Sequence, residues 1–319
     1  MKEHQTLRAV LKSTELPLVL ATLCKKVGSS YRGIGARLVS DGTRILSGSI
    51  SGGCIEADLV LKAKDLLKTR QSQLISYDLT SEAEDPFGYG MGCDGTISVL
   101  LQDSFQFEPY CQAIDLACKN RQEVYLTTNL TEGSNLGEQK IFYKKPDEDS
   151  EILLEQFTPP ISLVLFGGGR DAEPFIGVAS ILGWHVYLCD YRKGHLPEDL
   201  RSPCVTAIHG SPQQIIQQVP FDKSTAFVAM THQLGMDIEM VSEVMKTESF
   251  YIGLMGHRQR LRDLSLTGLK QDGRLYSPIG LDLGAREPSQ IALSLCSEIL
   301  AIYNGTKGSS LSAISKINL

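Results

Sequence analysis

The sequence predicts an α/β chain of two domains, in which an α+β domain is followed by a doubly wound parallel sheet. The chain has 319 residues, and domains usually hold about 100–200 residues each. Apolar runs of strand length alternate with helical spacing through the second half, which is typical of a parallel sheet with helices on both faces. A polar stretch punctuated by proline, 132–160, separates this half from a less regular first half.

These observations place the domain boundaries. We expect a first domain over 1–145, a linker over 146–160, a second domain over 161–303 and a tail rich in glycine and serine over 304–319.

Each element of the second half has a local signal. The near-continuous apolar run 161–166 indicates a buried strand, and three successive glycines end it. Helical spacing then runs to Gly183, a usual residue at a helix C-terminus. The expected strands are 161–166, 184–189, 205–208, 225–230 and 250–255. The expected helices are 171–182, 212–218, 236–246, 257–267 and 288–303.

The first half predicts an α+β domain with a mixed sheet. Asp41-Gly42 stands between two β-rich runs and is typical of a hairpin turn. The expected strands are 17–23, 36–40, 44–50, 73–79, 96–102 and 123–130. The expected helices are 4–12, 55–68 and 108–119.

Composition excludes several classes of function. The net charge is −6, so the chain lacks the basic footprint of a protein that binds nucleic acid. It contains no run of about 18 apolar residues, so no membrane span is expected. Eight scattered cysteines without any C-x-x-C pair favour a reducing compartment, hence the cytoplasm, and mostly buried thiols.

A glycine turn opens the second domain. Gly167-x-Gly169-x-x-Ala172 follows a strand and precedes a helix, and Asp190 ends the next strand, 23 residues after Gly167. This spacing predicts a Rossmann-like sheet in which the turn approaches a phosphate and the acidic residue binds a ribose. Asp171 opposes that interpretation, because a carboxylate in the first helical turn repels a phosphate. NAD(P) binding and a scaffold without a dinucleotide both stay open.

Two further polar residues follow strands of the same sheet. His232 comes after the strand that ends at Met230, and Arg258 comes after the strand that ends at Met255. Ligands bind at the carboxyl ends of such strands. We expect His232 either in the site or beside a helix start, and Arg258 either on a phosphate or at the surface.

Three glycine-rich segments mark the first domain. The first, 28–37, carries Arg32 and Arg37, which are candidates for holding a phosphate. The second, 48–58, places Cys54 before a helical pattern, where the helix dipole favours a thiolate. The third, 88–96, contains Gly92, Cys93 and Gly95. A thiolate in such a loop ligates molybdenum or copper or carries a persulfide. The alternative is that both cysteines are buried in tight turns.

The same segments resemble the XdhC/CoxI family. The resemblance rests on Gly28-Ser29-Ser30-Tyr31-Arg32-x-x-Gly35-Ala36-Arg37, on Gly48-Ser49-Ile50-Ser51-Gly52-Gly53-Cys54-x-Glu56, on Gly90-x-Gly92-Cys93-x-Gly95 and on the C-terminal segment 278–286. It implies an accessory factor of xanthine dehydrogenase-type molybdenum hydroxylases. Such a factor binds molybdenum cofactor (molybdopterin) transiently, assists its sulfuration with a cysteine desulfurase and inserts it into the apoenzyme. Cys93 is then expected to contact the molybdenum, with Cys54 beside it.

The residues leave other functions open. In an NAD(P)-dependent oxidoreductase, Gly167, Gly169 and Asp190 would bind the dinucleotide, and His232 or His257 would act as acid and base. A regulatory subunit would contact a molybdoenzyme without carrying a cofactor. We favour a cofactor chaperone over a catalyst, and we expect a homodimer.

Overall fold

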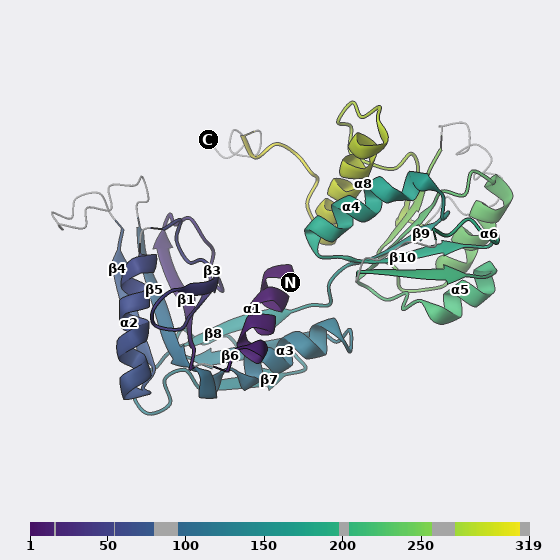
Figure 1. The fold of residues 1–319 in the computed structure, drawn as a ribbon. Helices are drawn as coiled ribbons and strands as arrows, with labels where there is room; N and C mark the ends of the chain where they lie inside the picture. The colour runs from purple at the N-terminus through teal and green to yellow at the C-terminus, as the bar shows by residue number, and fades with distance from the viewer. Residues whose placement is uncertain (16, 54, 80–94, 198–203, 257–271, 313–319) are drawn as a thin grey trace. The chain divides into compact units, whose positions relative to one another are not determined.

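The computed structural model describes residues 1–15, 17–53, 55–79, 95–197, 204–256 and 272–312. The chain divides into two compact units, Met1–Pro159 and Pro160–Leu319 (Figure 1). The range 146–160, expected as a linker, contains the strand β8 (Ile152–Phe157), which belongs to a sheet of the first unit. None of the described helices has the length and apolar character needed to cross a membrane.

The first unit is built on a five-stranded sheet. Its order is β3 (Ile45–Gly48), β2 (Arg37–Ser40), β1 (Val19–Gly28), β5 (Gly95–Asp103) and β4 (Gln73–Asp78). The expected hairpin around Asp41-Gly42 is confirmed, since β2 and β3 pair antiparallel across it. The expected mixed sheet is wrong, because all pairs among these described strands are antiparallel. Alternating apolar residues do not encode the direction of pairing, so the pattern alone carried no information on it.

The described part of this unit also contains a second sheet, of three antiparallel strands. It consists of β7 (Gln139–Phe142), β6 (Val124–Asn129) and β8. Helix α2 (Glu56–Thr69) packs on one face of the larger sheet. On its other face, α1 (Lys2–Ser13) and α3 (Glu108–Cys118) share a core with β1, β2, β6 and β8. The strand β1 is therefore apolar on both faces, as its sequence predicts.

The second unit is the doubly wound sheet that the sequence predicts. Its strands lie in the order β11 (Val205–His209), β10 (His185–Asp190), β9 (Ser162–Phe166), β12 (Thr225–Ala229), β13 (Tyr251–Leu254) and β14 (Leu275–Tyr276). Every pair is parallel. Numbered along the chain, this order is 3-2-1-4-5-6, the Rossmann arrangement, whose topological switch point lies between β9 and β12.

Helices cover both faces of this sheet. Helices α4 (Glu173–Leu182) and α8 (Pro288–Tyr303) pack on one face, and α5 (Pro212–Gln218) and α6 (Leu234–Val244) on the other (Figure 1). The helix expected over 171–182 begins as a 3₁₀ turn, Arg170–Ala172, before α4. The helix expected over 257–267 lies outside the described residues.

Two glycines of the second unit differ in the space that they leave for a side chain. Gly167 has φ +136°, and a Cβ there would lie 2.6 Å from the carbonyl oxygen of Met230. Gly177 lies inside α4 with open space around it. We expect Gly167→Ala to lower the free energy of unfolding by at least about 2 kcal/mol, and Gly177→Ala to raise it by roughly 0.5–1 kcal/mol. Urea unfolding measures both, and equal stability of Gly167→Ala and wild type would refute this turn geometry.

Candidate functional site

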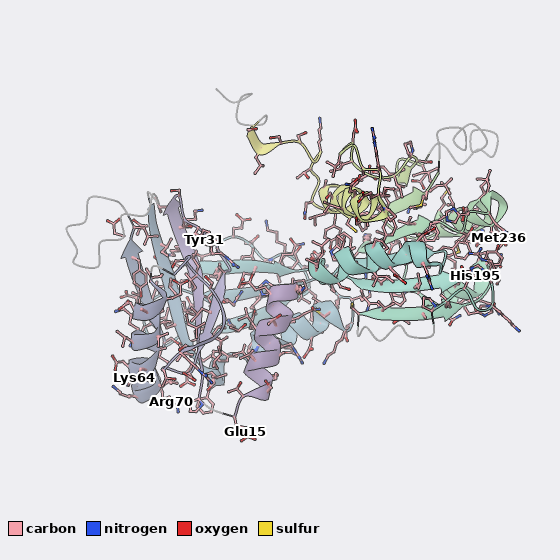
Figure 2. All side chains as sticks on the ribbon, turned by 45° about the horizontal axis from the view of Figure 1, so that its top comes forward. Glu15, Tyr31, Lys64, Arg70, His195 and Met236 are labelled. Atoms are coloured by element: carbon pink, nitrogen blue, oxygen red, sulfur yellow. The ribbon has the colours of Figure 1, made fainter. Side chains whose placement is uncertain are left out.

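The described parts of the three glycine-rich segments meet at one end of the five-stranded sheet. Gly28, at the end of β1, pairs with Gly95 at the start of β5. A Cβ on Gly95 would lie 2.4 Å from the carbonyl oxygen of Val27, so no side chain fits. A Cβ on Gly52 would lie 3.8 Å from the ring of Tyr31, which is 73% exposed. Figure 2 shows Tyr31 at the end of the sheet opposite Arg70.

The Glu56 carboxylate organises the loop that precedes Cys54. Its Oε1 accepts hydrogen bonds from the backbone N–H of Ser51 at 2.7 Å and of Ile50 at 3.2 Å. Its Oε2 accepts from the N–H of Gly53 at 3.0 Å and from the Ser51 hydroxyl. Burial alone would raise the pKa of Glu56, but the hydrogen bonds from Ser51, Ser49 and Ile50 outweigh it and lower that pKa. The spacing Cys54-x-Glu56 is visible in the sequence, but nothing in it predicts this role of the carboxylate.

The two candidate cysteines lie outside the described residues, as does Gly92. Cys54 follows Gly53 in sequence, and Cys93 precedes Gly95 by two residues. Six other cysteines are described, and all are free thiols. Burial raises the pKa of the Cys24 and Cys296 thiols to about 12, and it raises the pKa of Cys189 as well. These three thiols are neutral at pH 7 and act as small apolar core residues.

Arg37 is buried inside the first unit. Its side chain is 1% exposed, and its Nη1 and Nη2 donate to the two carboxylate oxygens of Glu155 at 2.8 and 2.5 Å. The guanidinium also lies over the ring of Tyr110, 4.2 Å from its centroid. Burial alone would lower the pKa of Arg37, but the Glu155 carboxylate outweighs it and raises that pKa. Sequence reasoning did not find Glu155, because it lies in β8, inside the expected linker.

Arg32 lies in the same neighbourhood but nearer to solvent. Its Nη2 donates to the Glu3 carboxylate at 2.6–2.7 Å, and both side chains are partly exposed. Arg32 and Arg37 line one cavity of about 420 Å³, together with His4. Both arginines expected to hold a phosphate are therefore brought together, each with a carboxylate.

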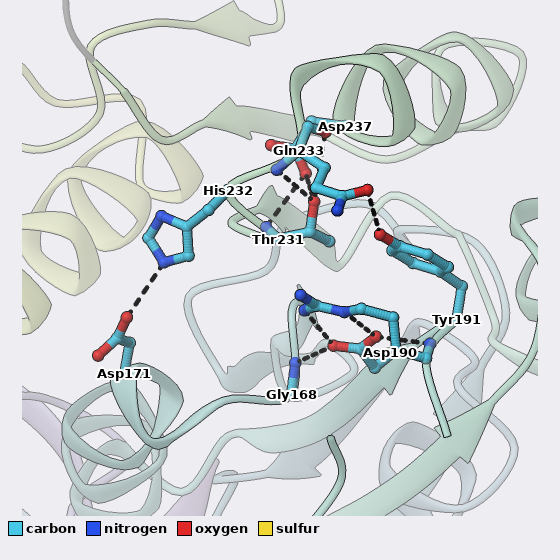
Figure 3. Close-up of polar contacts among 9 residues, drawn as sticks. Gly168, Asp171, Asp190, Tyr191, Thr231, His232, Gln233 and Asp237 are labelled. Atoms are coloured by element: carbon cyan, nitrogen blue, oxygen red, sulfur yellow. Dashed lines mark hydrogen bonds and ion pairs between the residues drawn. The ribbon is translucent and has the colours of Figure 1, made fainter. Parts of the chain in front are cut away.

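The second unit brings its glycine turn beside His232 at the switch point of the sheet (Figure 3). Gly167 approaches Met230 so closely that only glycine fits. A Cβ on Gly169 would have nothing within 4 Å, so the backbone there faces open space. The turn thus keeps the geometry that lets a phosphate approach the backbone.

Asp190, the expected ribose acceptor, is engaged by protein groups. It is fully buried, and its Oδ2 accepts from the N–H of Gly168 at 2.8 Å and from Nη2 of Arg192 at 2.8 Å. Its Oδ1 accepts from the backbone N–H and Nε of Arg192 at 2.8 and 3.0 Å. Burial alone would raise the pKa of Asp190, but the bonds from Arg192 and Gly168 outweigh it and lower that pKa. In this arrangement both oxygens of the Asp190 carboxylate accept hydrogen bonds from groups of the protein.

His232 forms an exposed pair with Asp171. The Nε2 of His232 lies 3.1 Å from Oδ2 of Asp171, and both side chains are 66% exposed. The backbone of His232 has φ +64°, a conformation that costs about 1–3 kcal/mol and that clusters at functional sites. The neighbouring Thr231 is held by Asp237, which accepts from its N–H and its hydroxyl. Arg258 and His257 lie outside the described residues.

Comparison with known proteins matches both halves of the chain. The model of the XdhC and CoxI family matches residues 11–78, and that of the XdhC Rossmann domain matches residues 163–299. A Bacillus subtilis (strain 168) protein, named as a probable subunit of xanthine dehydrogenase, is 30% identical over 93% of this chain and 96% of its own length. A molybdenum cofactor insertion chaperone of Escherichia coli (strain K12) is 22% identical over 89% of this chain and 83% of its own. The crystal structure of a xanthine dehydrogenase from Bacillus halodurans superimposes with a TM-score of 0.83 and 26% identity, covering 98% of this chain and 99% of that one.

The Glu56 network predicts a pH-dependent stability. A carboxylate with a lowered folded pKa stabilises the protein above its unfolded pKa, near 4.5, and that stabilisation is lost as the pH falls through the folded value. At pH 7 we expect Glu56→Gln to unfold more easily by about 1–3 kcal/mol. Urea unfolding at several pH values should show this gap shrinking below pH 4.5.

Asp65→Asn is the matched control. Asp65 lies on the same helix, and its side chain is 70% exposed beside Lys68. Its replacement should leave stability close to wild type at every pH. A gap for Glu56→Gln that stays constant down to pH 3 contradicts the assigned network.

Proposed function

Because the chain belongs to the XdhC and CoxI family, we propose that it is an accessory protein that binds molybdenum cofactor as cargo and inserts it into a xanthine dehydrogenase-type molybdoenzyme. One observation carries the proposal: the described parts of the three glycine-rich segments of the first unit converge at one end of one sheet. A relative named as a molybdenum cofactor insertion chaperone supports the cargo. A relative named as part of a xanthine dehydrogenase supports the recipient.

The proposed chemistry is that of soft sulfur ligands held by a shaped loop. Cys93 contacts the metal–sulfur centre, with Cys54 as the second thiolate, because thiolates prefer soft metals and carry persulfides. Gly92 and Gly95 let the backbone come close to the cargo. Glu56 holds the loop before Cys54 in shape through the N–H groups of Ser51 and Gly53.

We extend the proposal to the partners and the setting. A cysteine desulfurase supplies the sulfur for sulfuration, and the cofactor is carried transiently, since an insertion factor has to release its cargo. The protein works as a homodimer in the cytoplasm. The free thiols of the six described cysteines fit such a reducing compartment.

In this proposal the second unit contributes an anion site at its switch point. Gly167 and Gly169 form the turn, and His232 and Arg258 supply donors to the bound anion. The open space at Gly169 supports a close approach to the backbone. Asp171 beside His232 limits the net positive charge of this site.

The proposal is tested by analysing the cargo of the purified protein. Wild-type protein produced together with cofactor biosynthesis should contain molybdenum and pterin near one per chain, and Cys93→Ala should lose most of both. Cys204→Ala is the control, because Cys204 is a half-buried cysteine of the second unit whose Sγ forms a hydrogen bond with the Ser180 hydroxyl. Retention of molybdenum and pterin by Cys93→Ala contradicts the role of that thiolate.

An NAD(P)-dependent oxidoreductase is the second candidate, favoured by the strand order and the glycine turn. The ribose contact of that function needs a free carboxylate at Asp190, whereas Arg192 and Gly168 engage both of its oxygens. We therefore expect no saturable binding of NADH or NADPH up to about 1 mM in a fluorescence titration. Saturation at micromolar concentration with turnover of a hydroxy compound would favour the oxidoreductase instead.

A further inference from the structure

The cavity shared by Arg32 and Arg37 is formed by three separate pieces of the first unit. The start of α1, the loop before β2 and the strand β8 each contribute a wall. Its volume of about 420 Å³ lies in the range of pockets that hold small organic ligands. The lining combines four charged side chains with His4 and with the apolar Leu7, Ile34 and Leu154.

The charges in this cavity cancel in pairs. Arg37 is bound to Glu155 in the buried part, and Arg32 is bound to Glu3 at the more exposed part. Burial, Arg37 and the N-terminus lower the pKa of His4 to about 3, so this imidazole is neutral at pH 7. A phosphate needs an uncompensated cation. The cavity therefore fits a neutral polar molecule better than the phosphate that its arginines first indicated.

The buried ion pair leaves both a hydrogen-bond donor and hydrogen-bond acceptor positions unused. Within the described part of the chain, the Nε–H of Arg37 has no acceptor although it is buried. A carboxylate offers about four acceptor positions, and Arg37 occupies two of those on Glu155. A buried ion pair of this kind adds little stability on its own, because desolvation of both ions costs several kcal/mol. A ligand that accepts from Arg37 and donates to Glu155 would use the remaining capacity.

We propose that this cavity binds the 2-amino-4-oxopyrimidine edge of a planar heterocycle, the chemistry shared by pterin and guanine. The ring N–H donates to the remaining acceptor position of one Glu155 oxygen, the neighbouring 4-oxo group accepts from the Arg37 Nε–H, and Leu7 and Leu154 pack on the ring. The inference rests on the proposed function, in which this heterocycle is the pterin end of the cofactor. The loop that lines the cavity also carries Tyr31, which lies against Gly52, so the pterin end and the cysteine loops would share one segment.

The test measures binding of a pterin that has neither metal nor phosphate. Titration of the full-length protein with 6-hydroxymethylpterin, followed by pterin fluorescence, should show saturable binding that inorganic pyrophosphate does not displace. Glu155→Gln should weaken this binding at least about tenfold, because a charged acceptor is lost. Guanosine is the second arm. Tighter binding of the pterin assigns the cavity to pterin, whereas tighter binding of guanosine overturns the link to the cofactor.

A double variant guards against loss of fold. Glu155→Gln leaves Arg37 buried without its partner charge, which is strongly destabilising. Arg37→Met with Glu155→Leu replaces both charges by apolar groups and should keep the thermal unfolding temperature near that of wild type while abolishing pterin binding. The control pair is Arg8→Gln with Asp115→Asn, an ion pair between α1 and α3 outside the cavity, which should bind as wild type does.

The outcomes separate this inference from the proposed function. If hydroxymethylpterin does not bind, or binds equally well to the folded double variant, the cavity is not the pterin site. If molybdenum and pterin are nevertheless found in the protein purified from cells, the proposed function stands and only the cavity assignment falls. If hydroxymethylpterin does not bind and the protein purified from cells contains no molybdenum and pterin, both the cavity assignment and the proposed function are wrong.

Discussion

The buried pair of Arg37 and Glu155 is the interaction that fixes the loop before β2 and the lining of the cavity in the first unit. It joins the first residue of β2, in the five-stranded sheet, to β8 in the smaller sheet. Burying both charges costs several kcal/mol of desolvation free energy per ion, and close, bidentate hydrogen bonding is needed to offset this cost. The pair also depends on a glycine, because a Cβ on Gly35 would lie 3.0 Å from Oε1 of Glu155. The glycine of the family-like segment is thus explained by the approach of a carboxylate from a distant strand. Once the pair is formed, the loop before β2 has little freedom.

The same pair shows where sequence reasoning reaches its limit. The segment 28–37 was recognisable as a functional loop from its glycines and arginines alone. Its carboxylate partner was not, because β7 and β8 are short strands in a polar, proline-punctuated stretch that resembles a linker. These strands gain their stability from pairing with β6, a tertiary contact with no local periodicity to reveal it. In the second unit the central strands β9 and β12 are buried at every residue and flanked by helices, so the apolar runs themselves marked the fold. The pattern was therefore more informative there than in the antiparallel first half.

The chemistry open to the motif residues depends on carboxylates and their partners. Glu56 fixes the backbone before Cys54, Glu155 neutralises Arg37, and Asp190 is turned inward by Arg192. In each case a motif supplied the residue type, while its availability depended on a partner that spacing does not reveal. Asp190 illustrates this well: its position at the end of β10 is as the glycine fingerprint predicts, yet Arg192, only two residues further along, engages it. A motif is thus a statement about geometry, and its chemistry follows only when the neighbouring charges are known.

These compensated charges bear on why such a protein would carry a cofactor rather than use it. A catalyst needs groups whose charge is unbalanced and aimed at a reacting atom, since stabilisation of developing charge is its largest contribution to rate. The cavity of the first unit instead has two cations neutralised by two anions. Such sites recognise shape and hydrogen-bonding edges with modest electrostatic gain. A carrier benefits from this, because a cargo held mainly by directional hydrogen bonds and packing is released when a recipient offers more favourable contacts. A cargo held by a buried charge would leave that charge unpaired on departure, at a large cost in free energy.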